Sequence, residues 1–185
     1  MDLLDADARR ALVSRARAAI AHAIGAGADQ TSVEVPGPES PSLRDLRAGA
    51  FVTLRAGGAL RGCIGYPEPD LPLVEVVERC AVSAATSDPR FRPLSPAEWN
   101  TIDLELSVLG PIEPVNDIQD VAIGRDGLIV ESGRRRGLLL PQVAVEWKWD
   151  APEFAAQTCI KAGLPRDAWQ KGASLFKFEA EVFSL

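Results

Sequence analysis

Hydrophobic and polar residues alternate along several short stretches of the chain. The alternation is clearest at residues 102–108 and 176–182, where apolar side chains occupy every second position. A period of two is typical of β-strands with one face in the core and one in water. Two further apolar runs, residues 51–55 and 59–66, are joined by Ala56-Gly57-Gly58. They predict a β-hairpin.

A second pattern, with apolar residues three and four positions apart, predicts helices. The N-terminal helix is expected over residues 7–24. A second helix covers residues 71–86 with Asp70 as its cap, and a third follows the cap Asp150. Residues 95–98, Ser-Pro-Ala-Glu, form a capping box that predicts a short helix.

Hairpin, helix, short helix and strand occur twice in this order, which indicates an internal duplication. The predicted halves are residues 45–110 and 120–185, within a single domain over residues 1–185. Trp99 and Trp169 each follow a leucine at the same spacing. We expect an α+β fold with a mixed or antiparallel-rich sheet and packed helices.

The stretch Leu60-Arg61-Gly62-Cys63-Ile64-Gly65 carries the strongest chemical signal. Alternate side chains of a strand share a face, so Arg61 and Cys63 are expected to point the same way. A guanidinium beside a thiol favours the thiolate, which is the nucleophile and soft ligand. Gly62 and Gly65 would let a ligand or another backbone approach. The alternative is a small buried cysteine in a glycine-kinked strand.

The predicted second copy of this strand offers an internal control, because residues 136–140 align with the stretch after one gap. Leu138 and Leu140 stand there in place of Cys63 and Gly65. Leucine is the ordinary core residue for such a strand, so the cysteine and glycine call for another reason. The comparison favours a functional role for Cys63.

Composition narrows the classes of function. A formal net charge of -6 argues against a general nucleic-acid binder. No apolar run approaches the roughly 20 residues that cross a bilayer, and the start lacks the regions of a signal peptide. We therefore expect a cytoplasmic protein. The three cysteines have no metal-ligand spacing and the phosphate-loop and dinucleotide motifs are missing, so no metal and no cofactor is expected.

Four other groups of residues have both a structural and a functional interpretation. His22, the one histidine, is expected on a helix surface, which leaves a cysteine enzyme without a histidine base. Asp88-Pro89-Arg90-Phe91 is either a turn held by its own hydrogen bonds or a ligand site. Trp147-Lys148-Trp149 favours core packing over a stacking platform. Arg134-Arg135-Arg136, between two glycines, predicts a hairpin tip.

The sequence resembles the AMMECR-type domain, component A of the AmmeMemoRadiSam group. The resemblance rests on LRGCIG at 60–65, DPRF at 88–91, and GLLLPQVA from Gly137, and it runs from about Ala8 to Phe183. It implies an α+β domain with no established activity. It also implies association with a MEMO-type protein and a radical-SAM protein, and hence modification or redox chemistry.

The resemblance further implies a functional cleft around LRGCIG, formed by four residues: Arg61, Gly62, Cys63 and Gly65. Asp88, Arg90 and Gln142 are further candidates to line it. Our leading hypothesis is that the Cys63 thiolate, assisted by Arg61, binds or transiently carries a substrate. The alternative is a binding or scaffold module, not a catalyst, for a peptide or an anionic small molecule.

Overall fold

The computed structural model describes residues 4–26, 43 and 45–184. They form two compact units, here called unit 1 (Met1–Leu109 with Glu181–Leu185) and unit 2 (Gly110–Ala180). Among the described residues, every helix is too short or too polar to span a bilayer.

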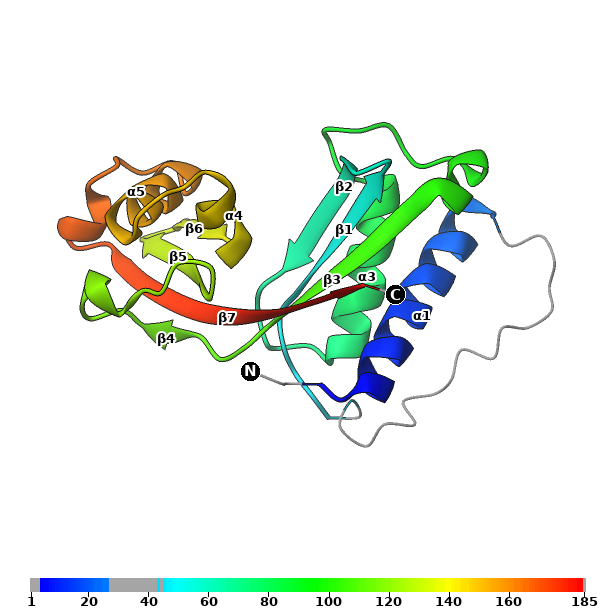
Figure 1. Ribbon diagram of the computed structural model, residues 1–185, viewed down its shortest axis with the longest axis horizontal. Helices are drawn as coiled ribbons and strands as arrows, with labels where there is room; N and C mark the ends of the chain where they lie inside the picture. The colour runs from blue at the N-terminus through cyan, green and yellow to red at the C-terminus, as the bar shows by residue number, and fades with distance from the viewer. Residues whose placement is uncertain (1–3, 27–42, 44, 185) are drawn as a thin grey trace. The chain divides into compact units, whose positions relative to one another are not determined.

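The described part of unit 1 contains two long helices, one short 3-10 helix and three strands of its own. In chain order these are α1 (Ala6–Ile24), β1 (Ala50–Ala56), β2 (Ala59–Tyr66), α3 (Leu73–Thr86), η1 (Pro96–Thr101) and β3 (Ile102–Leu109). β1 and β2 form the predicted hairpin, and β3 pairs with β1 on its other side. Figure 1 shows this arrangement.

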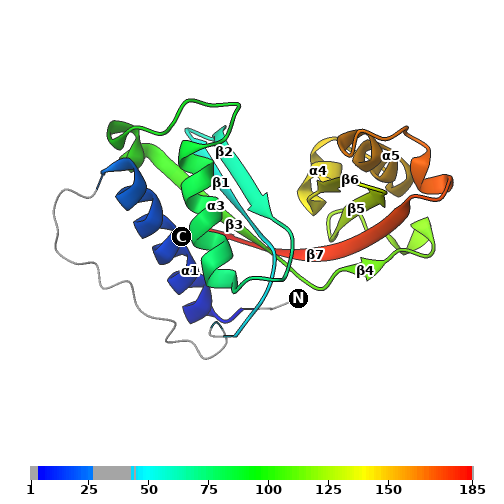
Figure 2. The ribbon, with the colours of Figure 1, turned by 180° about the vertical axis from the view of Figure 1, so that it is seen from behind.

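The helices of unit 1 follow from their caps and apolar stripes. α1 begins after Asp5, whose carboxylate accepts the Ala8 N–H at 2.7 Å, and ends at Gly25, where φ is 70°. α1 packs along α3, and α3 covers β1 and β2 (Figure 2). The largest fully buried side chains of this core include Leu12, Ile20, Leu54, Leu73, Leu104 and Leu106.

One predicted cap is wrong. α3 begins at Leu73 with Pro72 at its N-cap, two residues later than expected. Pro72 has extended backbone (ψ 134°), and no side chain caps the first turn of α3. Asp70 instead accepts the hydroxyl of Tyr66 at 3.0 Å.

The described part of unit 2 has two helices, two short 3-10 helices and four strands. They are β4 (Glu113–Pro114), η2 (Ile118–Asp120), β5 (Asp126–Ser132), β6 (Arg135–Leu139), α4 (Pro141–Glu146), α5 (Ala151–Lys161), η3 (Ala168–Gln170) and β7 (Ser174–Ser184), whose last residues belong to unit 1. Asp150 caps α5 as predicted, accepting the Glu153 N–H at 2.8 Å. α4 was not among the predicted helices; its sequence signal is Pro141 at the first helical position.

The strand order is β2-β1-β3-β7-β5-β6, with β4 beside β7, and the strand pairs described are antiparallel. The protein therefore has the predicted α+β fold. Within unit 2, the order β6-β5-β7 repeats the order β2-β1-β3 of unit 1. These matching pairings support the proposal of an internal duplication, which superposition of the two units would test.

Candidate functional site

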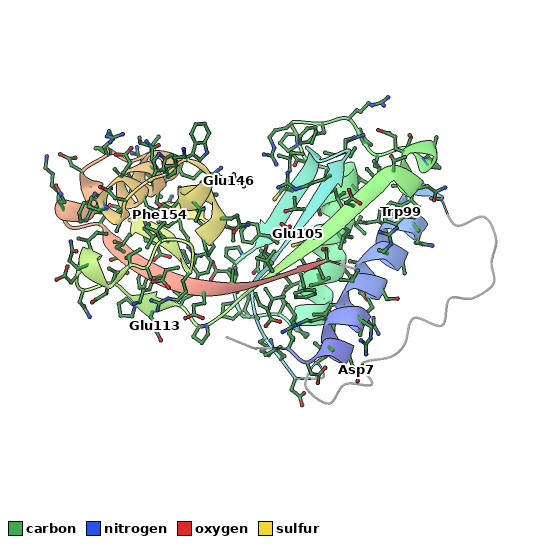
Figure 3. The ribbon with its side chains drawn as sticks, in the orientation of Figure 1. Asp7, Trp99, Glu105, Glu113, Glu146 and Phe154 are labelled. Carbon is green, nitrogen blue, oxygen red and sulfur yellow. The ribbon has the colours of Figure 1, made fainter. Side chains whose placement is uncertain are left out.

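Cys63 lies in the middle of β2 on the sheet face opposite α3. Its cross-strand neighbour is Thr53, whose hydroxyl donates to the Cys63 sulfur at 3.4 Å. Thr53 is itself nearly buried, and Glu105, labelled in Figure 3, stands opposite it on β3. The sulfur of a cysteine is a weak hydrogen-bond acceptor, and a hydroxyl can donate to it. Thr53 is thus a site residue that the strand pattern did not reveal, because only the register places it beside Cys63.

The backbone of Cys63 is held from outside the sheet by Asp88 and Arg90. Asp88 Oδ2 accepts the Cys63 N–H at 2.9 Å, and Arg90 Nη2 donates to the Cys63 carbonyl at 3.2 Å. β2 is the first strand in the order, so these side chains bond the outward-facing groups of an edge strand. The structure therefore brings three predicted site residues together and shows how two of them position the third.

Asp88 and Arg90 also form a two-pronged ion pair. The guanidinium donates to Asp88 Oδ1 at 3.0 Å and to Oδ2 at 2.7 Å. The Asp88 side chain is 2% exposed and that of Arg90 is 54% exposed. The hydrogen bond from Arg90 holds the pKa of the Asp88 carboxyl far below its ordinary value, although burial opposes this shift. Asp88 is therefore a carboxylate at physiological pH.

Arg61 takes a different direction from the one its spacing suggested. The register between β1 and β2 shifts, with Leu54 opposite Gly62 and Arg55 opposite Leu60, so Arg61 is the extra residue of a β-bulge. A bulge breaks the alternation of side chains and re-aims the bulged residue. The expectation that Arg61 shares a face with Cys63 fails for this reason.

The guanidinium of Arg61 is engaged with the segment around η1. It donates to Glu98 Oε1 from two nitrogens at 3.2 Å each, and to the Arg92 carbonyl at 2.9 Å. Ser95, with its hydroxyl and N–H, and then Arg61 lower the pKa of the Glu98 carboxyl to about 2. Arg61 therefore anchors η1 to β2, while Arg90 is the cation bonded to Cys63.

The two glycines of the motif have packing reasons. A Cβ on Gly62 would lie 2.2 Å from the Ala84 carbonyl oxygen, so the glycine lets α3 approach β2 closely. A Cβ on Gly65 would meet the ring of Phe51, its cross-strand neighbour, at 2.0 Å. Neither position needs a ligand to explain it, and their proposed ligand contacts stay a prediction.

Gln142 belongs to unit 2, as the second residue of α4. Its proposed place in the site stays a prediction. Ser107, opposite Phe51 on β3, shares the sheet face of Cys63 and was not singled out from the sequence. Its buried hydroxyl has no hydrogen-bond partner among the residues that the structure describes.

The other titratable candidates do not contribute a hydrogen bond to Cys63 among the described contacts. Cys80 and Cys159 are buried core residues, as expected for Cys80, and burial raises the pKa of the Cys80 thiol to about 11. His22 lies exposed on α1. Within the described ranges, no group of three or more His, Cys, Asp or Glu side chains could hold a metal ion.

The tryptophan pair differs in part from its prediction. Trp149 packs against the core of unit 2, but Trp147 is 67% exposed. The rings stack with centroids 5.9 Å apart and planes 15° apart. Lys148 between them has a φ of 56°, which turns the chain so that both rings lie on one side. Arg134, Arg135 and Arg136 lie at the predicted hairpin end, and the last two already have partners in Gly163 and Glu131.

The fold and this edge-strand cysteine define an α+β protein with a thiol held between a hydroxyl and an ion pair. Comparison with known proteins gives its family: residues 13–183 match the AMMECR1 family, and the chain belongs to it. A protein from Methanothermobacter thermautotrophicus is 46% identical over 188 residues, which are 97% of this chain and 95% of that protein. Protein MJ0810 from Methanocaldococcus jannaschii is 47% identical over 152 residues, 77% of this chain and 76% of that one.

A solved structure has a similar fold. The crystal structure of the uncharacterised protein PH0010 from Pyrococcus horikoshii matches with a TM-score of 0.82 and 43% identity, covering 94% of this chain and 89% of that one. These relatives confirm the expected family, and their names assign no activity. Function must therefore be argued from the residues of the site.

Proposed function

We propose that this member of the AMMECR1 family binds a small substrate on the face of unit 1 that carries Cys63, with the Cys63 thiolate as a nucleophile or soft ligand. The observation that carries the proposal is the 3.4 Å contact from the Thr53 hydroxyl to the Cys63 sulfur. A donor aimed at sulfur stabilises negative charge there. Packing alone would be satisfied by valine at residue 53.

The surroundings of the thiol support this role in two further ways. Cys63 is partly exposed, whereas Cys80 and Cys159 are buried, so it is the accessible thiol. Asp88 and Arg90 fix the backbone on both sides of its Cα, which lowers the freedom of the side chain before a substrate binds. Arg61 contributes indirectly, by holding η1 against β2 through Glu98.

The family resemblance supports the wider setting of the proposal. In that setting the protein acts in the cytoplasm, in a modification or redox pathway with MEMO-type and radical-SAM partners. Copurification of each partner with the wild-type chain and with Cys63→Ser would test physical association. Recovery of neither partner by either chain would contradict a stable complex.

Alkylation by iodoacetamide tests the thiolate directly. The thiolate forms a bond to the reagent's carbon and iodide leaves, while the thiol proton is lost to solvent. Mass spectrometry of the folded protein over a range of pH values should show Cys63 reacting first, and below the ordinary thiol pKa of about 8.5. Absence of reaction at Cys63 below that pH would overturn the proposal.

Thr53→Val provides the matched variant, because valine keeps the shape of threonine and removes the hydroxyl. We expect a slower reaction of Cys63 in this variant near pH 7, with unchanged protection of Cys80. Equal rates in the variant and the wild type would show that the hydroxyl contact does not tune the thiol.

A second candidate is a binding module for a peptide, and the position of β2 favours it. β2 lies at the end of the strand order, and an extended peptide can add to such an edge. Asp88 and Arg90 already occupy this edge at Cys63. An anionic ligand is less favoured, since Arg61 and Arg90 are each paired with a carboxylate. A peptide ligand would bind Cys63→Ser as tightly as the wild type.

A further inference from the structure

Unit 2 contains a pocket beside its short helix η3, whereas the corresponding short helix of unit 1, η1, contacts the long helix α1. In unit 1, α1 packs beside α3 and reaches β3 and η1. In unit 2, the helical neighbours of α5 are η2 and η3, and η2 is only three residues long. A three-residue turn covers less of β7 than a 19-residue helix covers of β3. The difference leaves room beside Trp169 of η3.

Trp169 occupies the place in unit 2 that Trp99 has in unit 1. Each tryptophan stands five residues after a leucine whose N–H bonds to the last turns of the preceding helix. Leu94 donates to the Ala85 carbonyl at 2.7 Å, and Leu164 donates to the Cys159 carbonyl at 2.9 Å. Each tryptophan is followed by the strand that pairs with the first strand of its unit's hairpin. Trp99 precedes β3, which pairs with β1, and Trp169 precedes β7, which pairs with β5.

The Trp99 ring has a cationic partner from α1. The guanidinium carbon of Arg17 lies 4.7 Å from the ring centroid, which is cation–π geometry. The described ring contacts include no such partner for Trp169. The helix that would supply one is the element that unit 2 lacks.

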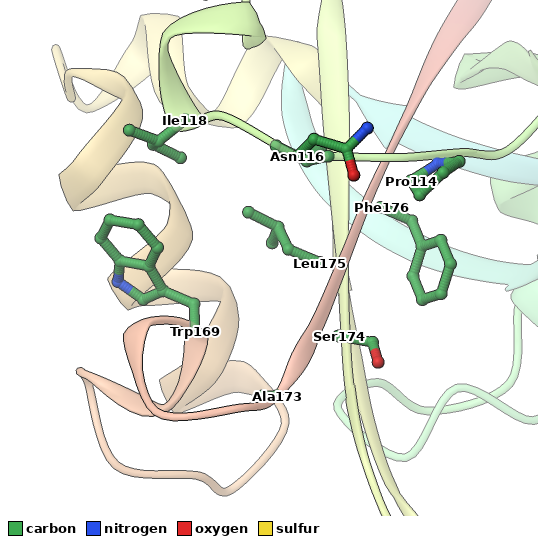
Figure 4. Close-up of a pocket in the computed structure, with 9 residues that line it drawn as sticks. Pro114, Asn116, Ile118, Trp169, Ala173, Ser174, Leu175 and Phe176 are labelled. Carbon is green, nitrogen blue, oxygen red and sulfur yellow. The ribbon is translucent and has the colours of Figure 1, made fainter.

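The pocket beside Trp169 has a volume of about 390 Å³ (Figure 4). Its apolar walls include Val115, Ile118 and Leu175, which pack on the core of unit 2. Asn116 and Ser174 add an amide and a hydroxyl, both of which have oxygens that accept hydrogen bonds. The lining therefore suits a flat group with several N–H donors.

The charged residues around the pocket favour a positively charged ligand group over a negatively charged one. The wall segment 113–120 contains three carboxylates and no basic residue. These are the exposed side chains of Glu113, Asp117 and Asp120. Lys177 offsets part of this charge, and its ammonium donates to the Asp120 carbonyl at 3.0 Å. A cation is attracted to such a rim and an anion is repelled.

We propose that this pocket receives an arginine side chain from a helix of a partner protein, with the guanidinium stacked on the Trp169 ring as that of Arg17 stacks on Trp99. The partner helix lies against η3 and β7, as α1 lies against η1 and β3 in unit 1. This inference concerns unit 2 and does not rest on the chemistry of Cys63.

A peptide copying residues 5–26, the α1 helix with Arg17, is the probe, added to the full-length chain. Titration followed by NMR should shift the indole N–H signal of Trp169. The control peptide carries Arg17→Gln and should bind at least about fivefold more weakly, from the loss of the cation–π contact. Raising the salt concentration should weaken binding of the first peptide.

Two variants of the chain locate the site. Trp169→Leu should abolish binding, and Trp147→Leu, which removes an exposed tryptophan elsewhere, should retain it. Because Trp169 also packs on the core, the exposed Asp120→Asn gives a second test and should weaken binding without unfolding unit 2. No shift at Trp169, a shift at Trp99 alone, or equal binding of both peptides would overturn the proposal.

Discussion

The backbone carbonyl of Ala84 lies where the side chain of residue 62 would begin: a Cβ on Gly62 would be 2.2 Å from that oxygen. The contact fixes how closely α3 approaches β2, and β2 carries Cys63. The glycine next to the cysteine is thus a packing requirement, and the chemistry of the motif depends on it.

Gly62→Ala should destabilise the protein by about 2–3 kcal/mol, because the backbone of α3 has to move. Gly65→Ala is the matched control. Its added methyl group meets the Phe51 ring, which can turn away at a smaller cost. Urea unfolding of both variants measures the difference. A larger loss for Gly65→Ala would contradict this account of the two glycines.

Arg90 and Arg61 should differ in their effect on the thiol. Arg90→Gln removes the guanidinium that bonds the Cys63 carbonyl, so the thiolate loses a nearby positive charge. We expect Cys63 alkylation at pH 7 to slow about threefold or more. Arg61→Gln should change that rate by less than about twofold, because Arg61 is paired with Glu98. The reverse order would restore Arg61 as the group that activates Cys63.

The ion pair of Asp88 and Arg90 should make stability depend on pH on the acid side. The pKa of Asp88 is lowered in the folded state, so its contribution is fully present above the unfolded value of about 3.9. It is lost as the pH falls below that value toward the folded pKa. Asp88→Asn should therefore be less stable at pH 7, and its deficit should shrink as the pH falls below 4.

Unfolding free energies of the wild type and Asp88→Asn between pH 7 and pH 2 measure this dependence. Asp103→Asn, at an exposed position of β3, is the control and should follow the wild type. If the unfolding free energy of Asp88→Asn stayed below that of the wild type by a constant amount over this range, the charge of the Asp88 carboxylate would not be the source of the stabilisation.

Lys148 holds the left-handed backbone that stacks Trp147 on Trp149. Glycine adopts that conformation without the clash of a Cβ, so Lys148→Gly should be neutral or stabilising by up to about 1 kcal/mol. The same change at Lys161, in α5, should destabilise by a similar amount. Thermal unfolding of the two variants distinguishes these signs. Destabilisation by Lys148→Gly would mean that the lysine side chain has a contact worth more than its strain.

Much of the fold could be predicted because its signals are local. The capping box at Ser95 and the Asp150 cap depend on residues three positions apart, and both hold in the structure. The failures are equally physical. Asp70 does not cap α3 because the helix begins two residues later than predicted, with Pro72 at its N-cap. α4, with six residues, is too short for a period of 3.6 to show.

The residues of the candidate site can likewise be separated into those that local sequence signals predicted and those that only the tertiary structure placed. The motif identified Cys63, and the DPRF turn supplied Asp88 and Arg90, which the structure brings to the same backbone. The sequence could not show Thr53 as the neighbour of the thiol, since that depends on the pairing of β1 with β2. The sequence also predicted the wrong direction for the Arg61 side chain, because a shift of one residue in strand register changes the direction in which a side chain points.

The sequence by itself determined the elements, the family resemblance and the one thiol worth testing, since periodicity, caps and motifs act over a few residues. Only the tertiary structure decided what surrounds that thiol. Strand register, a bulge and the approach of a helix to a glycine are set by contacts between distant residues, and these gave Cys63 a hydroxyl and an ion pair as neighbours while Arg61 went to Glu98.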